Sequence, residues 1–294
     1  MKILITGAAG FLGSHILKNL IKEKHTVIAL TLSSADNSRI SKELKKIKHY
    51  NSDKCSLERI FSENKNIGCV IHAATLYGRN NESVHEIFDT NTHLPLKLLS
   101  LTVKNKVKLF INTDTNLPYN AHGKMRDYVM SKKQFLEWSV LCAQTQTAFV
   151  NVIPEYMYGA FDDMTKFLPF VINKCVSDAK KLDLTNGGQK RDFIYVEDIA
   201  CAYEKIARNK HKGFTEYQIG TGKTKSLKNA VLTISKLTKS STKLNFGAIP
   251  YRKDDKMFSK ANIKNILSLG WKPKYSFEDG IKKIISLQYP GRHK

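Results

Sequence analysis

A glycine-rich turn near the start of the chain constrains the fold more than any other feature. The segment Gly7-Ala-Ala-Gly-Phe-Leu-Gly13 follows the apolar run Ile3-Leu4-Ile5-Thr6 and precedes apolar residues at helical spacing. A strand, a glycine turn and a helix in this order form the context of a phosphate-cradling loop. The glycines permit a tight turn and close backbone approach to a pyrophosphate, and the helix N-terminus faces the negative charge. We therefore expect a dinucleotide to bind at Gly7, Gly10, Phe11, Leu12 and Gly13.

Short apolar runs and helical patterns alternate through the first half of the chain. The runs are bounded by turn residues, as buried parallel strands are, and the alternation predicts right-handed crossovers and a doubly wound sheet. The expected strands are Lys2–Thr6, Thr26–Leu30, Cys69–His72, Lys108–Asn112 and Ala148–Ile153, and the expected helices cover 11–23, 37–47, 56–64, 84–104 and 126–145.

After residue 158 the alternation ends. The sequence therefore predicts an α/β protein: a Rossmann doubly wound parallel sheet in residues 1–158, and a smaller, mixed α/β, mainly substrate-binding domain in residues 159–294. Residues 183–200 and 224–240 are expected to return to the first sheet. The expected elements of this part are helices at 164–179, 196–209 and 224–238 and a strand at Arg191–Tyr195.

Composition narrows the class of protein. The net charge of +22 is typical of nucleic-acid binders, but the lysines are spread in short stripes of the kind found on solvated helix faces. We therefore expect no nucleic-acid partner. No apolar run approaches membrane-spanning length, and no signal-peptide pattern opens the chain, so a cytoplasmic protein is expected. Without CxxC spacing, the five cysteines predict reduced structural thiols and no metal site; they are Cys55, Cys69, Cys142, Cys175 and Cys201.

The end of the second expected strand bears on the cofactor. In NAD-binding units a carboxylate usually follows this strand, whereas here the strand leads into Thr31, with Ser33 and Arg39 beyond. The missing acid removes repulsion against a 2′-phosphate, and hydroxyls with a guanidinium suit a phosphate. We therefore expect NADP (NADPH), with NAD as the alternative. Ala73 and Ala74, after the strand that ends at His72, are small enough for the cofactor ribose to lie against the backbone, although packing alone explains them equally well.

Tyr128 and Lys132 are four residues apart, so on a helix they share one face. An ammonium near a phenol favours the phenolate and lowers a pKa that is about 10 when unperturbed. Such pairs often occur by chance. Thr113, at the end of the strand Phe110-Ile111-Asn112, places a hydroxyl at the carboxyl edge of the sheet, where it would bond the same substrate oxygen as the phenol.

The glycine motif, Thr113 and Tyr128xxxLys132, in this order, closely resemble the extended short-chain dehydrogenase/reductases that act on nucleotide-linked sugars. The resemblance covers nearly the whole chain. It implies that Thr113, Tyr128 and Lys132 are catalytic and that Arg191 and Arg252 contact the diphosphate of the substrate. Further similar segments are Asp89-Thr-Asn91-Thr, Arg191-Asp-Phe-Ile-Tyr-Val-Glu-Asp198, Tyr217-Gln-Ile-Gly-Thr-Gly222 and Leu269-Gly-Trp-Lys-Pro273.

Departures from the family pattern narrow the chemistry. The family's 4,6-dehydratases have Thr-Asp-Glu where this chain has Thr113-Asp114-Thr115, so the base that would abstract the C5 proton is absent. The segment Asn112 to Pro118 most resembles 4-ketoreductases of the CDP-abequose synthase and dTDP-fucose kind, which make 6-deoxy or dideoxy sugars such as those of lipopolysaccharide O-antigens. The residues expected to contact the substrate are Thr75, Asp114, Thr115, Tyr156, Arg191 and Arg252.

The resemblance thus implies NADPH-dependent reduction of the C4 keto group of a nucleotide-linked 4-keto-6-deoxyhexose, with Tyr128 donating the proton. One alternative is a nucleotide-sugar 4-epimerase with tightly bound NAD. An alternative of another class is a non-catalytic dinucleotide-binding or RNA-associated regulator, which only the excess of lysine favours. The family further implies a homodimer through the helices at 84–104 and 126–145.

Overall fold

The structure of the protein is a computed structural model that describes residues 1–79, 81–118, 125–142, 146–252 and 255–293. The chain forms two compact units. It leaves the first unit after Pro154 and returns to it at Ala200, in the middle of a helix. The first unit comprises Met1–Pro154, Ala200–Tyr217 and Ser268–Gly270, and the second comprises Glu155–Ile199, Gln218–Leu267 and Trp271–Lys294.

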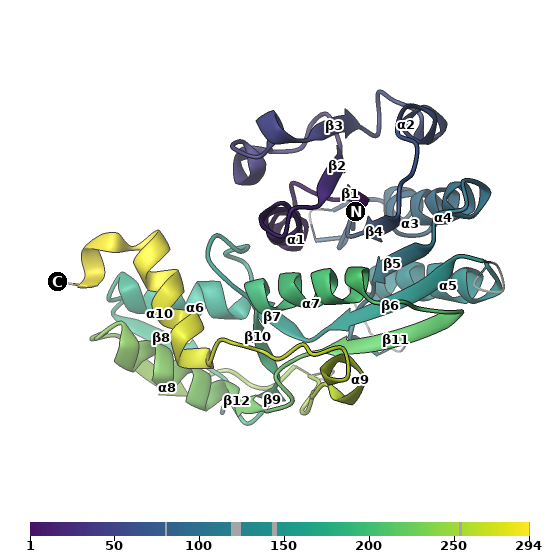
Figure 1. The fold of residues 1–294 in the computed structure, drawn as a ribbon. Helices are drawn as coiled ribbons and strands as arrows, with labels where there is room; N and C mark the ends of the chain where they lie inside the picture. Colours follow the sequence, from purple (N-terminus) through teal and green to yellow (C-terminus); the bar gives the residue numbers. More distant parts are fainter. Residues whose placement is uncertain (80, 119–124, 143–145, 253–254, 294) are drawn as a thin grey trace. The chain divides into compact units, whose positions relative to one another are not determined.

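The first unit is built around a sheet that has seven strands within the described ranges (Figure 1). These strands are β1 (Lys2–Thr6), β2 (Thr26–Thr31), β3 (Lys48–Asn51), β4 (Cys69–His72), β5 (Leu109–Thr113), β6 (Ala148–Pro154) and β11 (Phe214–Ile219). Their order is β11-β6-β5-β4-β1-β2-β3, and the pairs from β3 to β6 are parallel. β11 also runs parallel to β6, because the bonds from Phe149 to Gly213 and from Glu155 to Ile219 advance together. This arrangement confirms the predicted doubly wound α/β fold.

The order of the strands indicates where along the sheet a ligand would bind. β1 lies between β2 and β4, so the strand order reverses there, and ligands of such sheets bind beyond the carboxyl ends of the strands at this point. The three central strands are almost entirely buried and apolar, which fixes their position inside the unit. Thr6, His72 and Thr113 are the last residues of β1, β4 and β5, and therefore lie along this edge.

A cluster of aromatic rings fixes the helix that carries Tyr128 and Lys132. Phe135, on this helix, packs against Phe110 of β5 and Phe149 of β6, with ring centroids 6.2 and 6.1 Å away. The two strand rings stack on each other at 5.5 Å. The helices of the first unit are α1 (Phe11–Lys22), α2 (Leu57–Glu63), α3 (Val84–Phe88), α4 (Leu94–Lys104), α5 (Arg126–Cys142) and the part of α7 (Val196–Arg208) that begins at Ala200.

One sequence prediction for the first unit is wrong, and an edge strand was not predicted. The helix expected at 37–47 is reduced to two 3-10 turns, Ser38–Ile40 and Leu44–Lys46, because Ile40 is the one buried residue of the segment and too little apolar surface is covered to stabilise a longer helix. β3 was not predicted, since its sequence Lys-His-Tyr-Asn is polar, as an edge strand of a sheet allows. The helix expected at 84–104 is present, but a π-helical turn, Asp89–His93, separates α3 from α4.

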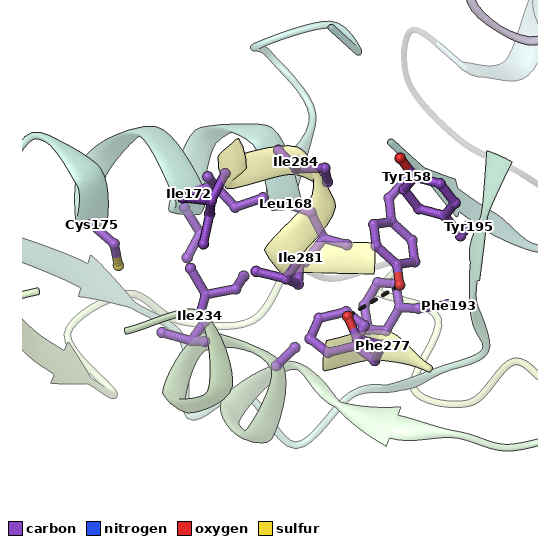
Figure 2. Close-up of a cluster of buried hydrophobic side chains, with 14 of the residues drawn as sticks. Tyr158, Leu168, Ile172, Cys175, Phe193, Tyr195, Ile234, Phe277, Ile281 and Ile284 are labelled. Carbon is purple, nitrogen blue, oxygen red and sulfur yellow. Dashed lines mark hydrogen bonds between the residues drawn. The ribbon is translucent and has the colours of Figure 1, made fainter. Parts of the chain in front are cut away.

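In the part of the second unit that the structure describes, three two-stranded sheets combine with helices. Tyr158, Phe193, Ile172, Ile234 and Ile281 belong to its buried apolar core, shown in Figure 2. The paired strands are β7 (Tyr156–Tyr158) with β10 (Phe193–Tyr195), β8 (Lys181–Leu184) with β13 (Lys243–Phe246), and β9 (Lys190–Arg191) with β12 (Lys225–Ser226). The helices are α6 (Phe167–Val176), the first part of α7, α8 (Leu227–Leu237), α9 (Lys264–Leu267), α10 (Phe277–Gln288) and the 3-10 turn Pro290–His293.

The segments that return to the first sheet differ from those predicted. Residues 183–200 and 224–240 contribute β8, β9, β10 and β12, whose partners among the described strands belong to the second unit. The returning strand is β11 instead. Its last four residues, Glu-Tyr-Gln-Ile, alternate between polar and apolar, the pattern of a half-buried edge strand, and the sequence analysis predicted no strand here.

Within the described residues, no helix is both long and apolar enough to span a membrane. The same residues contain no cluster of three or more potential metal-binding side chains. Cys69 and Cys175 are buried, and burial raises the pKa of both thiols. Cys55 and Cys201 are partly exposed. The side chain of Cys142 lies outside the described part of the chain.

Candidate active site

The glycine turn between β1 and α1 is shaped by contacts between backbones. Gly7 has a left-handed φ of +66°, and a Cβ on it would lie 2.6 Å from the amide nitrogen of Ala74. A Cβ on Gly13 would collide with the carbonyl oxygen of Gly7. Gly10 caps α1 without a side chain, so the first amides of the helix remain available to an anion. Glycine is therefore required at positions 7 and 13, and the turn presents bare backbone at the carboxyl edge of the sheet.

A hydrogen-bonded group joins the carboxyl ends of β1 and β4. The Thr6 hydroxyl oxygen accepts from the amides of Ala73 and Ala74 at 3.2 and 3.3 Å, so its own proton is donated to Nδ1 of His72 at 2.9 Å. His72 is fully buried, and burial, together with the nearby Lys132 ammonium, holds the pKa of its ring well below the usual value. The ring is therefore neutral and carries its proton on Nε2. These hydrogen bonds hold Ala73 and Ala74 against the glycine turn, a close approach that their small side chains allow.

The residues after β2 are held by side chains that the sequence analysis did not consider. The Thr31 hydroxyl is buried and hydrogen-bonded to Nε2 of His49 at 2.8 Å. The backbone amide of Ser33 donates to the Asp53 carboxylate at 2.8 Å, and the Ser33 hydroxyl donates to the other oxygen of the same carboxylate. Arg39 is partly buried in the 3-10 turn that follows. A carboxylate thus lies at the end of β2, although the sequence of β2 and its loop shows none at positions 31 to 34.

Tyr128 and Lys132 lie one helical turn apart near the start of α5, and both are buried. Burial raises the pKa of the Tyr128 phenol far above its usual value; Tyr77 adds to this shift, and a hydrogen bond from Thr115 opposes it. The predicted decrease of this pKa is therefore wrong for the protein without ligands. Burial lowers the pKa of Lys132 to about 8, against the opposing charge of Asp114. Its Nζ has no hydrogen-bond partner among the described residues.

Two threonine hydroxyls near Tyr128 have different partners. The hydroxyl of Thr113 is hydrogen-bonded to the phenol of Tyr203, on α7, at 2.7 Å. Thr115, rather than Thr113, interacts with the Tyr128 phenol. Its oxygen also accepts from the Leu117 amide at 3.2 Å, a turn that fixes the side chain. The structure therefore places the Thr115 hydroxyl in contact with the Tyr128 phenol, whereas the Thr113 hydroxyl is bonded to Tyr203.

Tyr77 and Arg79 belong to the same surroundings and were missed by the sequence analysis. The Tyr77 ring packs on the Tyr128 ring with centroids 4.9 Å apart, and the Arg79 guanidinium lies 5.1 Å from the Tyr77 ring centroid. Their position in the chain was the signal that could have pointed to this site, because both residues closely follow β4, whose end lies at the carboxyl edge of the sheet. The positive charge of Arg79 partly offsets the rise in the pKa of Tyr128.

Asp114 faces the interior of the first unit. One of its carboxylate oxygens accepts from Lys133 and from the Asn151 amide, each at 3.0 Å, and its side chain is fully buried. Asn151 also accepts from Asn112 at 2.9 Å. These contacts give Asp114 an electrostatic and structural function beside Lys132, and they compete with the substrate contact that the sequence analysis expected.

Asn91, in the π-helical turn, ties the loop after β4 to α5. Its amide oxygen accepts from the Thr75 hydroxyl at 3.1 Å and from the Leu76 amide at 2.9 Å. Its amide nitrogen donates to the Leu76 carbonyl at 2.8 Å and to the Ser131 hydroxyl at 3.0 Å. Because Ser131 lies between Tyr128 and Lys132 in the sequence, Asn91 sets the position of both. Thr75, expected to contact substrate, also serves this junction.

The second unit holds the other expected substrate contacts. The Arg191 guanidinium lies 4.9 Å from the centroid of the Tyr156 ring and 3.6 Å from the Asp255 carboxylate. Gln189 donates to the same carboxylate at 2.7 Å. Arg191 is thus a buried, oriented cation with an aromatic ring beside it. Arg252 is exposed.

The residues present fit a dinucleotide. The glycine turn leaves room that a Cβ would fill, the uncapped N-terminus of α1 suits a diphosphate, and the buried Lys132 ammonium lacks a partner within the described part of the chain. Hydroxyl groups of a ribose are suitable acceptors for such an ammonium. Bound, a nicotinamide dinucleotide would supply or accept a hydride at this edge of the sheet.

Comparison with known proteins agrees with this geometry. Residues 3–220 match the model of the NAD dependent epimerase/dehydratase family. The chain belongs to this family. Membership makes it an NAD(P)-dependent oxidoreductase with an extended short-chain dehydrogenase/reductase fold. A second match, over residues 163–284, is to the GDP-mannose 4,6 dehydratase model.

Individual members of the epimerase/dehydratase family give further likenesses. CDP-abequose synthase of Salmonella muenchen is 37% identical over 292 residues, covering 98% of each chain. CDP-abequose synthase of Salmonella typhimurium strain LT2 is 35% identical, covering 96% of this chain and 97% of the other. The crystal structure of UDP-glucuronic acid 4-epimerase from Bacillus cereus, in complex with UDP-glucuronic acid and NAD, covers 98% of this chain and all of its own with a TM-score of 0.84. At 21% identity, this last likeness shows the fold alone.

The two aspartates of the RDFxxVxD segment, Asp192 and Asp198, have structural roles in this chain. The Asp192 carboxylate accepts from the amides of Thr221 and Gly222 at 2.8 and 2.9 Å. Asp198 accepts from the amides of Lys274 and Tyr275 at 2.9 and 3.0 Å. They connect the segment that carries Arg191 to the Tyr217–Gly222 segment and to the residues that follow Pro273.

Proposed function

We propose that the protein reduces the C4 keto group of a nucleotide-linked 4-keto-6-deoxyhexose, using a reduced nicotinamide dinucleotide, in the biosynthesis of a deoxysugar. The observation that carries the proposal is the end-to-end identity of 37% with a CDP-abequose synthase. The absence of a glutamate at Thr115, where dehydratases carry their base, supports a reductase over a dehydratase.

The residues of the first unit suit proton donation. The glycine turn and Lys132 would hold a reduced nicotinamide dinucleotide, which would supply the hydride for the carbonyl carbon. Tyr128, whose raised pKa keeps it protonated at neutral pH, donates its proton to the oxygen as the alkoxide forms. Thr115 holds the phenol oxygen, and Lys132 follows one helical turn later on α5. The Lys132 ammonium and the glycine turn bind and orient the cofactor.

In this proposal the residues of the second unit bind the diphosphate of the substrate. Arg191 supplies a charge for the diphosphate, Tyr156 an aromatic surface beside it, and Arg252 a second, exposed guanidinium. The donor remains open between NADPH and NADH. The premise for NADPH, a β2 end without an acid, does not hold once Asp53 is bonded to Ser33.

A panel of CDP-, dTDP-, GDP- and UDP-linked 4-keto sugars tests the function, with loss of cofactor absorbance as the signal and NMR to identify the product. Tyr128→Phe should reduce turnover by about 10²–10⁴, the usual contribution of a positioned acid. Near-normal turnover by this variant would refute the assignment. Release of NAD⁺ on denaturation, with interconversion of a UDP-hexose pair and no added cofactor, would instead indicate a 4-epimerase.

We also propose a homodimer through α5. Leu98, Leu99 and Phe135, large apolar residues of the two helices expected at the interface, are buried within the first unit. Trp138 and Leu141 remain exposed, with 55% and 61% of their surface accessible. Large exposed apolar side chains on one helix face are typical of an interface. Light scattering should give twice the chain mass, and Trp138→Glu should give the monomer.

A further inference from the structure

Lysines that are far apart in the sequence meet at one edge of the first sheet. Its seven described strands all run in the same direction, so their amino ends lie along the edge opposite the glycine turn. The five residues before each of β2, β3, β4, β5 and β11 include one to three lysines, all of them exposed. These lysines are Lys22, Lys24, Lys45, Lys46, Lys65, Lys104, Lys106, Lys108, Lys210 and Lys212.

The opposite edge of the sheet has a different charge. The five residues after each of β1 to β5 include a single lysine, Lys54. Their acids are Asp36, Asp53 and Asp114. At the amino edge, the corresponding segments carry the acids Glu23 and Glu43, and Glu23 is already paired with Arg208 at 3.1 Å. Positive charge is therefore concentrated at one end of the strands, and the acids there do not balance it.

The helices that end at this edge explain only part of the pattern. Lys22 and Lys104 are the last residues of α1 and α4, where a cation interacts favourably with the helix dipole. This effect falls off within the last turn of a helix. Lys108 and Lys212 stand four residues beyond the ends of α4 and α7. The number of lysines therefore exceeds what the stability of the helices requires.

The lysines form a row and not a pocket. Neighbouring strands lie about 4.8 Å apart, so the row from β11 to β3 is about 30 Å long. Charges on adjacent strands lie within the Debye length of about 8–10 Å, so they act together on an anionic surface. Strands such as β1 and β5 are about 16 Å long, which separates the row from the glycine turn. A partner bound along the row would leave the carboxyl edge of the sheet free.

The composition of this edge favours a lipid surface over a nucleic acid. The five segments, which the structure describes in full, contain no arginine and no phenylalanine, tyrosine or tryptophan. Arginine forks and aromatic stacking are the usual means of holding phosphates and bases. Because α1, α4 and α7 end here, the edge presents carbonyl groups and not the free amides that bind single phosphates. Lysines on flexible stems respond instead to the summed charge of an anionic bilayer, which demands no fixed geometry.

We propose that the amino edge of the first sheet is a docking surface for an anionic lipid bilayer. The association is electrostatic and reversible, and the carboxyl edge, where the glycine turn lies, stays open to solution. The sequence analysis treated the same lysines as separate solvated stripes, because their gathering depends on the order and direction of the strands. The proposal is independent of the sugar substrate and of the reaction proposed above.

The test is co-sedimentation of the full-length protein with vesicles of phosphatidylglycerol and phosphatidylcholine in equal parts, with pure phosphatidylcholine vesicles as the neutral control. Wild type should bind the anionic vesicles alone. Binding should disappear as salt rises from about 0.1 to 1 M, because the Debye length falls from about 10 to 3 Å. The triple variant Lys65→Gln, Lys104→Gln, Lys108→Gln should bind about 10- to 100-fold more weakly, since each lysine near such a surface contributes about fivefold in affinity.

The matched control removes the same charge from the second unit. Lys236→Gln, Lys272→Gln and Lys282→Gln together replace exposed lysines there and should bind nearly as well as wild type. Thermal unfolding checks that both triple variants fold, and the pair Lys22→Gln and Lys212→Gln replaces the first variant if it does not. Absence of binding to anionic vesicles, equal binding to neutral ones, or equal weakening in both variants would overturn the proposal. Tighter binding, per phosphate, to polyuridylate or a DNA duplex at the same salt would also overturn it and assign the edge to a nucleic acid.

Discussion

The hydroxyl of Thr113 is hydrogen-bonded to the buried phenol of Tyr203 at 2.7 Å, and not to the phenol of Tyr128. Tyr203 lies on α7, ninety residues further along the chain. The hydroxyl in contact with Tyr128 belongs to Thr115. The hydroxyl beside the Tyr128 phenol is therefore that of Thr115, whereas the sequence motif suggests Thr113.

Thr115→Val should therefore lower turnover more than Thr113→Val. Loss of the Thr115 hydroxyl removes the hydrogen bond to the phenol oxygen, and one such bond is worth about tenfold in rate when it acts in the transition state. Thr113→Val removes a bond to Tyr203, and Tyr203→Phe should resemble it. The measurement is kcat with whichever 4-keto sugar the wild type reduces. A larger loss in Thr113→Val would mean that Thr113 leaves Tyr203 when substrate binds.

Lys132→Met should raise the melting temperature while abolishing turnover. The folded protein depresses the pKa of Lys132 from 10.5 to about 8, so the buried lysine opposes folding when it is charged. Between about pH 8 and the unfolded pKa, the unfolded chain binds more protons than the folded one, so wild-type stability recovers as pH rises through this window. The advantage of Lys132→Met, on the order of 1–3 kcal/mol, should therefore be full below pH 8 and shrink above it.

Lys133→Met is the matched control for this experiment. Lys133 is adjacent in sequence, but its ammonium is paired with buried Asp114 at 3.0 Å. Its loss leaves a buried carboxylate without its counter-charge, so this variant should be destabilised. Stabilisation by both variants would show that the gain comes from placing an apolar residue on this helix, and not from removing the buried charge of Lys132.

Gly13→Ala should destabilise the first unit and prevent cofactor binding, because its Cβ meets the carbonyl oxygen of Gly7. Relief of this clash requires the glycine turn to open or α1 to shift. Thermal unfolding and titration with NADH measure the two effects. Gly291→Ala is the control, since a Cβ at that position meets nothing within 4 Å. A Gly13→Ala protein with wild-type stability and affinity would show that the turn tolerates a side chain.

Gly280→Ala should destabilise the second unit by about 1–3 kcal/mol, the usual cost of overpacking. A Cβ at Gly280 would collide with the Tyr158 hydroxyl and lie 2.8 Å from the ring carbon Cε2. Tyr158 cannot move freely, because its hydroxyl donates to the Phe277 carbonyl at 3.3 Å and its ring is buried in the core (Figure 2). Denaturant unfolding measures the change, and Tyr158→Phe should restore part of it. Lys282→Ala, exposed on the same helix, should have little effect.

The sequence by itself determined the doubly wound fold and the succession of its central strands and helices along the chain, because glycine turns and buried apolar runs are local signals. It also determined that Tyr128 and Lys132 share a helical turn. The edge strands β3 and β11 were not predicted, since polar or alternating residues pair there only because a neighbouring strand is already in place.

Tertiary structure alone decided which side chains meet. Nothing near Ser33 in sequence predicts that Asp53 bonds to it, because the contact arises from the register of β2 on β3. Likewise, burial raises the pKa of Tyr128 where the motif predicted a decrease, since desolvation of a phenol by packed neighbours outweighs the nearby charges. Local sequence sets spacing along one element, whereas hydrogen bonds and desolvation between elements depend on distances that only the folded chain defines.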